Sequence, residues 1–323
     1  MKLKAGIKIA NYALKRKLGE GGFGEVWLAK EDDIGRYVAL KLLNPTLTDE
    51  ENIKRFILES RNTAKLEHDN IISVFAANES EGFYYMALPY IEGKDLSNSD
   101  KLPEKDALSI VRDIADALKY AWDTHKIIHR DIKPENIMID EFAEVKLMDM
   151  GISKSLIETN LGLTMTGTII GTPNFISPEQ ALASKNIDFR TDVFSLGVTL
   201  NHLITKELPF NSKNAVETFE MVVNKEVIDL NNVNKHISKQ CARLIKKMTA
   251  KEPANRYASW GAVIKDIDKV SNGEFPQITV TKNKSRSDAI NVSNDDNSNN
   301  NLHYILFGVL VIIIILLIMI LFM

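Results

Sequence analysis

The sequence predicts an α+β fold followed by one membrane-spanning helix, and three features of the chain support this prediction. Residues 12–43 are strand-like and are interrupted by a glycine-rich loop, whereas a long amphipathic helical pattern begins at Pro103. Residues 305–322 are apolar without a single charge, and with Met323 they make 19 residues. At ~1.5 Å per residue this is about 28 Å of helix, which is enough to cross the core of a bilayer.

The composition of the 323 residues excludes several classes of protein. A hydrophobic content of 45% and a charged content of 26% are ordinary for a globular protein. The net charge of −3 gives no electrostatic reason to expect a nucleic-acid partner. Cys241 is the single cysteine, so an intramolecular disulfide is excluded, and its place on an apolar helical face predicts a buried structural thiol. Residues 1–4 precede no long apolar stretch, so we expect no signal peptide.

The glycine-rich loop at residues 19–26 contains the pattern G-x-G-x-x-G, formed by Gly19, Gly21 and Gly24. Alone, the pattern fits a dinucleotide site, a phosphate-binding hairpin or a merely structural hairpin. A dinucleotide site would open a helix after the glycines, but residues 26–29 continue as a strand. Because glycines permit close approach of the backbone to a phosphate, we expect a phosphate-binding hairpin.

Helical patterns follow the strands. Residues 48–51 have the sequence of a capping box, and the helix that they begin has an apolar stripe that includes Phe56. Residues 83–91 are predicted to form a strand. The helix that begins at Pro103 carries one apolar face, formed by Leu108, Val111, Ile114, Ala115 and Leu118.

The candidate chemistry is concentrated in the stretch 127–139. Short apolar runs, predicted as buried strands, flank a polar loop that carries Asp131, Lys133 and Asn136. A further strand-like run delivers Asp149. This combination suits phosphoryl transfer, because one carboxylate can accept the proton of a hydroxyl and the lysine can offset phosphate charge. The amide and the second carboxylate are hard oxygen ligands for magnesium.

Residues 129–136 resemble the catalytic loop of protein kinases, H-R-D-x-x-x-x-N. The resemblance implies a bilobal kinase fold over residues 12–270, with a small β-rich N-lobe and a large α-helical C-lobe. It implies that Asp131 is the catalytic base, that Asn136 binds magnesium and that Lys133 contacts the γ-phosphate. Lysine at that spacing resembles the serine/threonine branch of the family.

Other motifs resemble further kinase elements. Lys41 ends a V-A-x-K strand and resembles the phosphate-binding lysine, and Glu59 resembles its helical partner, the alternative being a surface glutamate. Asp149-Met150-Gly151 stands in place of D-F-G, which implies that Asp149 is the second magnesium ligand. The methionine departs from the family and puts the tightness of the active-state switch in doubt. His129 is expected to pack in the core rather than to act as a base.

The resemblance implies binding of ATP with Mg²⁺, or alternatively Mn²⁺. The residues expected to contact the nucleotide are Leu18, Gly19, Gly21, Gly24, Val26, Ala39, Lys41, Pro89, Ile91 and Met138. Pro89 is a departure because proline has no N–H, but the family uses the carbonyl of that hinge position and the N–H of Ile91.

The segment after Asp149 is expected to be regulatory. Thr164 and Thr166 are predicted autophosphorylation sites, and Thr172 is predicted to contact the Asp131–Lys133 pair from the substrate-side loop. That loop resembles the family segment ending in A-P-E. The family pairs the glutamate of this segment, here Glu179, with an arginine, here Arg256.

Over about residues 12–270 the chain is similar to the eukaryotic-like serine/threonine kinases of bacteria. We expect an N-terminal extension at 1–11, the kinase domain at 12–270, a disordered Asn/Ser-rich linker at 271–301 and a transmembrane helix at 302–323. The catalytic domain is expected on the cytoplasmic side of a single-pass, C-terminal anchor, acting on Ser/Thr of protein substrates and self-associating for autophosphorylation. The alternatives are a pseudokinase scaffold and a kinase for small-molecule hydroxyls.

Overall fold

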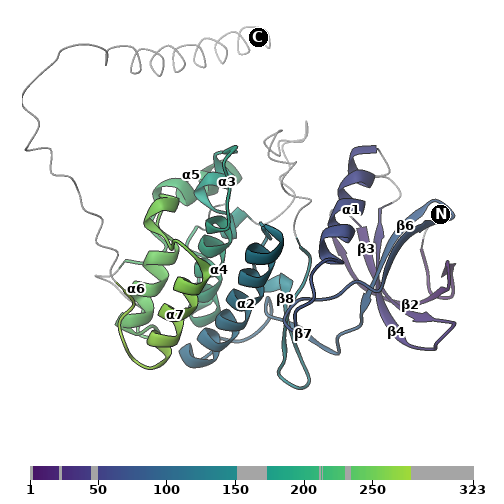
Figure 1. Ribbon diagram of the computed structural model, residues 1–323, viewed down its shortest axis with the longest axis horizontal. Coiled ribbons are helices and arrows are strands. Elements are labelled where there is room, and N and C mark those ends of the chain that lie inside the picture. The colour runs from purple at the N-terminus through teal and green to yellow at the C-terminus, as the bar shows by residue number, and fades with distance from the viewer. Residues whose placement is uncertain are drawn as a thin grey trace, which may run out of the picture. The chain divides into compact units, whose positions relative to one another are not determined.

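A six-stranded antiparallel sheet forms the smaller lobe (Figure 1), with the strand order β1-β2-β3-β4-β6-β5. The strands are β1 (Lys8–Ile9), β2 (Tyr12–Gly21), β3 (Gly24–Glu31), β4 (Tyr37–Leu43), β5 (Ala76–Ser80) and β6 (Phe83–Pro89). Leu14, Leu40 and Ala87 are buried together on one side of this sheet. Because β1 pairs with β2, part of the predicted N-terminal extension belongs to the sheet.

Helix α1 (Glu50–Thr63) stands against the sheet on its other side (Figure 1). Its Phe56 is buried with Ala39, Met86 and Leu88 of the neighbouring strands. The same apolar stripe that predicted the helix therefore fixes its rotation, and this rotation directs Glu59 toward β4.

The larger lobe is helical and surrounds one buried core. Its helices are α2 (Glu104–His125), α3 (Pro178–Ala181), α4 (Arg190–Thr205), α5 (Ala215–Asn224), α6 (Lys239–Met248) and α7 (Trp260–Ser271). The predicted apolar face of α2 is confirmed, since its five residues are at most 1% exposed. Helix α4 is buried along almost its whole length and packs against α2 and α6. A three-stranded sheet of β7 (Gly93–Asp95), β8 (Ile137–Asp140) and β9 (Val145–Leu147) lies where this lobe meets the smaller one (Figure 1).

A buried ion pair holds the substrate-side segment to the helical lobe. The guanidinium of Arg256 contacts both carboxylate oxygens of Glu179, at 2.6 and 2.8 Å, and it also donates to the carbonyls of Ala250, Lys251 and Arg190. The predicted pair of Glu179 and Arg256 is thus confirmed. Every nitrogen of the arginine has an acceptor, which is the condition under which a buried charge is tolerated.

This computed structural model describes residues 3–21, 24–44, 50–150, 173–210, 212, 214–229 and 234–277. The predicted capping box at 48–51 is described only in part. Thr164, Thr166, Thr172, most of the predicted linker and the predicted transmembrane helix lie outside these residues. Among the helices that are described, none is long and apolar enough to span a membrane.

Candidate active site

The polar loop between α2 and β8 brings three predicted site residues together. The ammonium of Lys133 lies 3.2 Å from Oδ2 of Asp131. The side-chain amide of Asn136 donates to the same oxygen at 3.2 Å and to the backbone carbonyl of Asp131 at 2.7 Å. The carboxylate of Asp131 is therefore oriented by two donors from its own loop, and its side chain is only 16% exposed.

The backbone of this loop is held by Asp192, the third residue of α4. Its carboxylate accepts the N–H groups of His129 and Arg130, both at 2.7 Å. Arg130 has a φ of +65°, a conformation that a non-glycine residue adopts only when its surroundings impose it. Asp192 is 2% exposed, and burial raises its pKa to about 7 although both backbone donors act in the opposite direction.

Sequence reasoning did not identify Asp192 as part of the site. The signal was an acidic residue at the start of a largely apolar helix, where Val193, Phe194 and Leu196 are all buried. A charged group there must have donors from elsewhere in the chain. Gln180 was missed as well, and its side chain donates to the carbonyl of Arg130 at 2.9 Å.

His129 packs in the core, as expected. It is fully buried, its Nδ1 accepts the N–H of Asp131 at 3.2 Å, and its Nε2 lies 2.9 Å from the carbonyl of Met148. With Nδ1 accepting, Nε2 must carry the proton that the carbonyl accepts. Both nitrogens are thus engaged, and neither is available as a general base.

Lys41 joins the two lobes through a pair of carboxylates. Its ammonium lies 2.8 Å from Glu59 of α1 and 2.7 Å from Asp149, which follows β9. Burial opposes the charge of Lys41, but Asp149 and Glu59 outweigh it and raise the lysine pKa above its ordinary value. Burial likewise opposes ionisation of Asp149, but the charge and hydrogen bond of Lys41 hold the pKa of that carboxyl below its usual range. Lys41 and Asp149 are therefore both charged at neutral pH.

The donor set fits a magnesium ion. The side-chain amide nitrogen of Asn136 donates to Asp131, so the Oδ1 atom of Asn136 is left for a cation. Lys41 contacts only the Oδ1 atom of Asp149, so the other oxygen of that carboxylate is left for a cation as well. One amide and one carboxylate oxygen, completed by phosphate oxygens and water, is a common magnesium environment. Among the described residues, no cluster of three or more His, Cys, Asp or Glu side chains forms an alternative metal site.

The three glycines of the loop differ in what requires them. A Cβ on Gly24 would lie 1.8 Å from the carbonyl oxygen of Leu42, so packing against β4 excludes any side chain there. At Gly19 and Gly21 an added Cβ would meet no atom within 4 Å, and neither residue has a positive φ. Neither packing nor backbone conformation requires glycine at these two positions. The remaining reason is that a backbone without side chains lets a phosphate approach closely.

The predicted adenine contacts gather in one apolar cluster. Leu18, Val26, Ile91 and Met148 pack against a buried cluster that includes Ala39 and Leu88. Met138 is half-buried in β8 and is not part of this cluster. Pro89 ends β6, and within the described residues no acceptor takes the N–H of Ile91. The hinge thus offers the donor that the family uses.

Met150 takes the place of the family phenylalanine and is fully buried. It packs with Leu66 and Ile71 of the smaller lobe's connection and with Ala117 and Ala121 of α2. The methionine therefore bridges the lobes by apolar contact, next to the Asp149 carboxylate that bridges them by charge.

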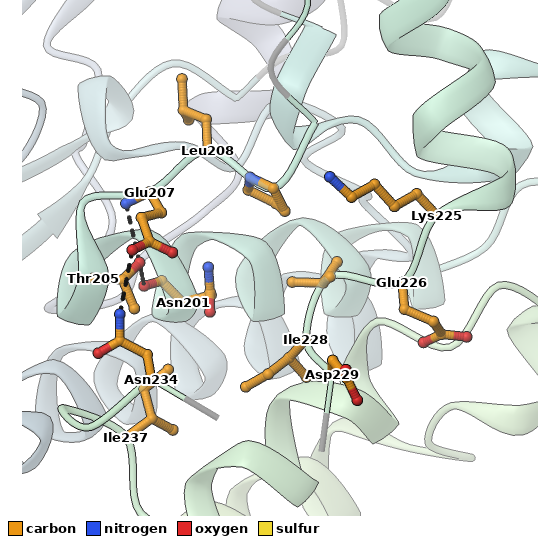
Figure 2. Close-up of a pocket in the computed structure, with 12 residues that line it drawn as sticks. Asn201, Thr205, Glu207, Leu208, Lys225, Glu226, Ile228, Asp229, Asn234 and Ile237 are labelled. Carbon is orange, nitrogen blue, oxygen red and sulfur yellow. Dashed lines mark hydrogen bonds between the residues drawn. The ribbon is translucent and has the colours of Figure 1, made fainter. Parts of the chain in front are cut away.

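A separate pocket lies in the larger lobe (Figure 2). It measures about 230 Å³ and is lined by the end of α4 and by the segments that follow α5. Figure 2 shows Asn234 directed toward Glu207, to which it donates a 3.3 Å hydrogen bond. None of the predicted catalytic residues lines this pocket, so we assign the chemistry to the polar loop and not to the pocket.

The fold and the geometry of the polar loop are those expected of a protein kinase, and comparison with models of protein families agrees. Residues 12–267 match the model of the protein kinase domain, so the chain belongs to the protein kinase family. The solved kinase domain of Mycobacterium tuberculosis PknI has the same fold, with a TM-score of 0.62 and 25% identity over 84% of this chain and all of that one.

The curated relatives indicate which kind of protein kinase this domain is. PrkC of Bacillus subtilis is 32% identical over 88% of this chain, and PknB of Mycobacterium tuberculosis is 34% identical over 82% of it. Both are serine/threonine-protein kinases, and the domain described here is of that bacterial type. The aligned region spans only 45% and 44% of the length of those two relatives.

The buried carboxyl of Asp192 predicts a pH dependence with a definite sign. Its pKa is about 7 in the fold against an ordinary value of 3.8, so folding favours the protonated form. The stabilisation is fully present below the unfolded pKa and is lost as the pH rises through the folded pKa. We expect the difference in free energy of unfolding between the wild type and Asp192→Asn to shrink from pH 4 to pH 8. At about 1.4 kcal/mol per pKa unit, the change is a few kcal/mol.

Denaturant unfolding of both proteins across this range measures the difference, and subtraction removes the other titrating groups. A difference that grows with pH would contradict the raised pKa.

Proposed function

We propose that this protein is an active serine/threonine protein kinase that transfers the γ-phosphate of ATP to hydroxyl groups of proteins. The observation that carries the proposal is the placement of Lys41 within hydrogen-bond distance of both Glu59 and Asp149. A pseudokinase scaffold has no need of this arrangement together with an oriented Asp131. The relatives' activity as serine/threonine kinases supports the same conclusion.

The residues divide the work of phosphoryl transfer. Asp131, fixed by Asn136 and Lys133, accepts the proton of the attacking hydroxyl, and Lys133 offsets charge on the transferred group. Asn136 and Asp149 would hold magnesium, which supplies charge neutralisation between the phosphates. Lys41 is held in place by Glu59 to meet the phosphates.

We infer in addition that the protein is attached to a membrane by its C-terminal apolar run, with the catalytic domain on the cytoplasmic side. The uncharged sequence of residues 305–322 supports the attachment, and the need for ATP supports the orientation. Confinement beside a bilayer raises the rate at which copies meet, which favours phosphorylation of one copy by another.

Activation by autophosphorylation is part of this proposal. Arg130 lies next to the catalytic Asp131, and among the described residues no carboxylate pairs with its guanidinium. A phosphate on Thr164 or Thr166 would give this arginine an anionic partner and order the segment between Asp149 and Glu179.

Asp131→Asn is expected to lower the rate of peptide phosphorylation by about 10²–10⁴-fold, because only the proton acceptor is lost. The melting temperature should stay close to that of the wild type. A radiometric assay with a Ser/Thr peptide measures the rate, and Asp106→Asn, on the exposed first turn of α2, is the matched control. Turnover at the wild-type rate in Asp131→Asn would contradict the assignment of Asp131 as the catalytic base.

Incubation with ATP and Mg²⁺ is expected to add phosphate to Thr164 and Thr166. Tandem mass spectrometry of the wild type locates the phosphates, and Asp131→Asn treated in the same way controls for a contaminating kinase. Phosphate found only outside residues 152–172 would refute this part of the proposal.

Removal of the tail is expected to change location but not chemistry. A chain ending at Asn301 should be recovered in the soluble fraction and should retain turnover on an added peptide. At matched low concentration it should autophosphorylate more slowly than the full chain in vesicles. Fractionation and time courses measure both effects. Recovery of the full chain in the soluble fraction without detergent would contradict membrane attachment.

A further inference from the structure

The chain does not leave the kinase domain at the end of α7. Residues 272–277, which we call the strap, turn back over α6 and α7. The carbonyl of Gly273 accepts from Gln240 at 3.0 Å, and the carbonyl of Gln277 accepts from Lys247 at 2.9 Å. Within the strap, Pro276 is buried. The strap is therefore docked on α6 at both of its ends.

A buried carboxylate secures the far end of the strap. Asp266 of α7 is 1% exposed, and it accepts the backbone N–H of Gln277 at 3.0 Å. Its other oxygen accepts from the hydroxyl of Tyr257 at 3.0 Å and from Lys247 at 3.2 Å. Breaking this attachment would leave a buried charge short of a donor, which is costly. The segment that follows Gln277 thus starts from a fixed point on the domain.

The exposed face of α6 beside the strap is basic. Lys239, Arg243 and Lys246 follow one another at helical spacing and are exposed, whereas the opposite face of the helix is buried in the core. We call these three residues the basic stripe. Within the part of the chain that the structure describes, no carboxylate forms an ion pair with any of them. The strap contributes one exposed acidic residue, Glu274, so this surface keeps an excess of positive charge.

An exposed aromatic side chain lies at the edge of the stripe. Phe275 of the strap is 46% exposed, and the guanidinium of Arg243 lies 4.5 Å from the centre of its ring. A phenylalanine beside several unpaired cations is the combination found on surfaces that lie on anionic bilayers, with the ring in the interface and the cations at the phosphates.

The sequence beyond the strap places a bilayer within reach. If residues 305–322 are inserted, residues 278–301 join the strap to the membrane, with a span of about 27 Å for ~5–6 Å × √24. Figure 1 shows α6 and α7 at the end of the larger lobe farthest from the sheet of the smaller lobe. A bilayer contact at α6 would therefore lie at the end of the larger lobe that faces away from the smaller lobe.

We propose that the basic stripe and Phe275 form a docking surface for the anionic lipid headgroups of the membrane that anchors the chain. This proposal rests on the membrane attachment proposed above. Docking converts a loose attachment into a defined orientation, since the strap and the stripe fix one face of the domain toward the lipid. Near an anionic surface each basic residue contributes roughly 5-fold to the local equilibrium.

The test uses the full chain with Phe275→Trp in nanodiscs of phosphatidylcholine, with and without phosphatidylglycerol, containing a lipid spin-labelled at its headgroup. We expect the label to quench the added tryptophan in anionic discs but not in neutral ones, and the quenching to fall as salt is raised. In the same chain, Lys239→Gln, Arg243→Gln and Lys246→Gln together should reduce the docked fraction at least 10-fold, as a contribution of roughly 5-fold per residue implies.

The matched control removes three positive charges elsewhere. Lys4, Lys15 and Lys65 are exposed on the smaller lobe, and their joint replacement by Gln should leave the quenching unchanged. Melting temperatures near that of the wild type show that both variants fold.

The outcomes separate the two proposals. Incorporation of the chain without headgroup quenching, or equal quenching in neutral discs, overturns the docking surface alone. Binding of the stripe to an acidic protein or to nucleic acid in place of lipid would also give no quenching here. A chain that fails to enter the discs overturns the membrane attachment, and the docking surface with it.

Discussion

The contact between Asp192 and the backbone of residues 129–130 is the constraint on which the active site depends. Asp131 can present its carboxylate only if the residue before it adopts a φ of +65°, which an arginine does not favour. A buried carboxylate that accepts two 2.7 Å hydrogen bonds from the backbone supplies the compensation. Because α4 is enclosed by the other helices, the position of the catalytic loop is in effect set by the packing of the helical core.

The smaller lobe is coupled to this loop at two adjacent points. Lys41 forms an ion pair with Asp149, and Met150 packs against apolar residues of α2 and of the connection after α1. Because Asp149 and Met150 are consecutive, a displacement of the segment would disturb the ion pair and the packing together. Methionine is flexible and fills irregular space, and here it is fully buried, so the departure from the family pattern keeps an enclosed apolar side chain at this position.

The sequence predicted those parts of the fold and site that depend on short-range pattern. The spacing of Asp131, Lys133 and Asn136 is local, and the apolar face of α2 follows from helical periodicity alone. The Lys41–Glu59 pair was predicted because both residues lie in segments that resemble kinase motifs. The structure places all of these as expected.

The rest depends on contacts between distant segments, and no local signal identifies the partner in such a contact. Asp192 lies 63 residues from His129, and nothing in its neighbourhood names its partner. Gly24 looked like one of three equivalent glycines, but only tertiary packing shows that the carbonyl of Leu42 excludes a side chain there. The strap follows a helix whose end marks the expected limit of the domain, and its docking depends on Asp266 in the preceding helix.

Three buried carboxylates share one physical role in the larger lobe. Asp192 holds the catalytic loop, Glu179 fixes its own substrate-side segment to Arg256, and Asp266 holds the strap. Each of the segments held lacks the regular hydrogen bonding of a long helix or strand at that point, so apolar packing alone could not fix the direction of its backbone. A carboxylate with two or more donors can, because hydrogen bonds are directional whereas hydrophobic burial is not. The cost is the desolvation of a charge, and it is offset only while every donor stays in place. The loss of any one of these acids would therefore leave buried donors unpaired and release the segment that it fixes.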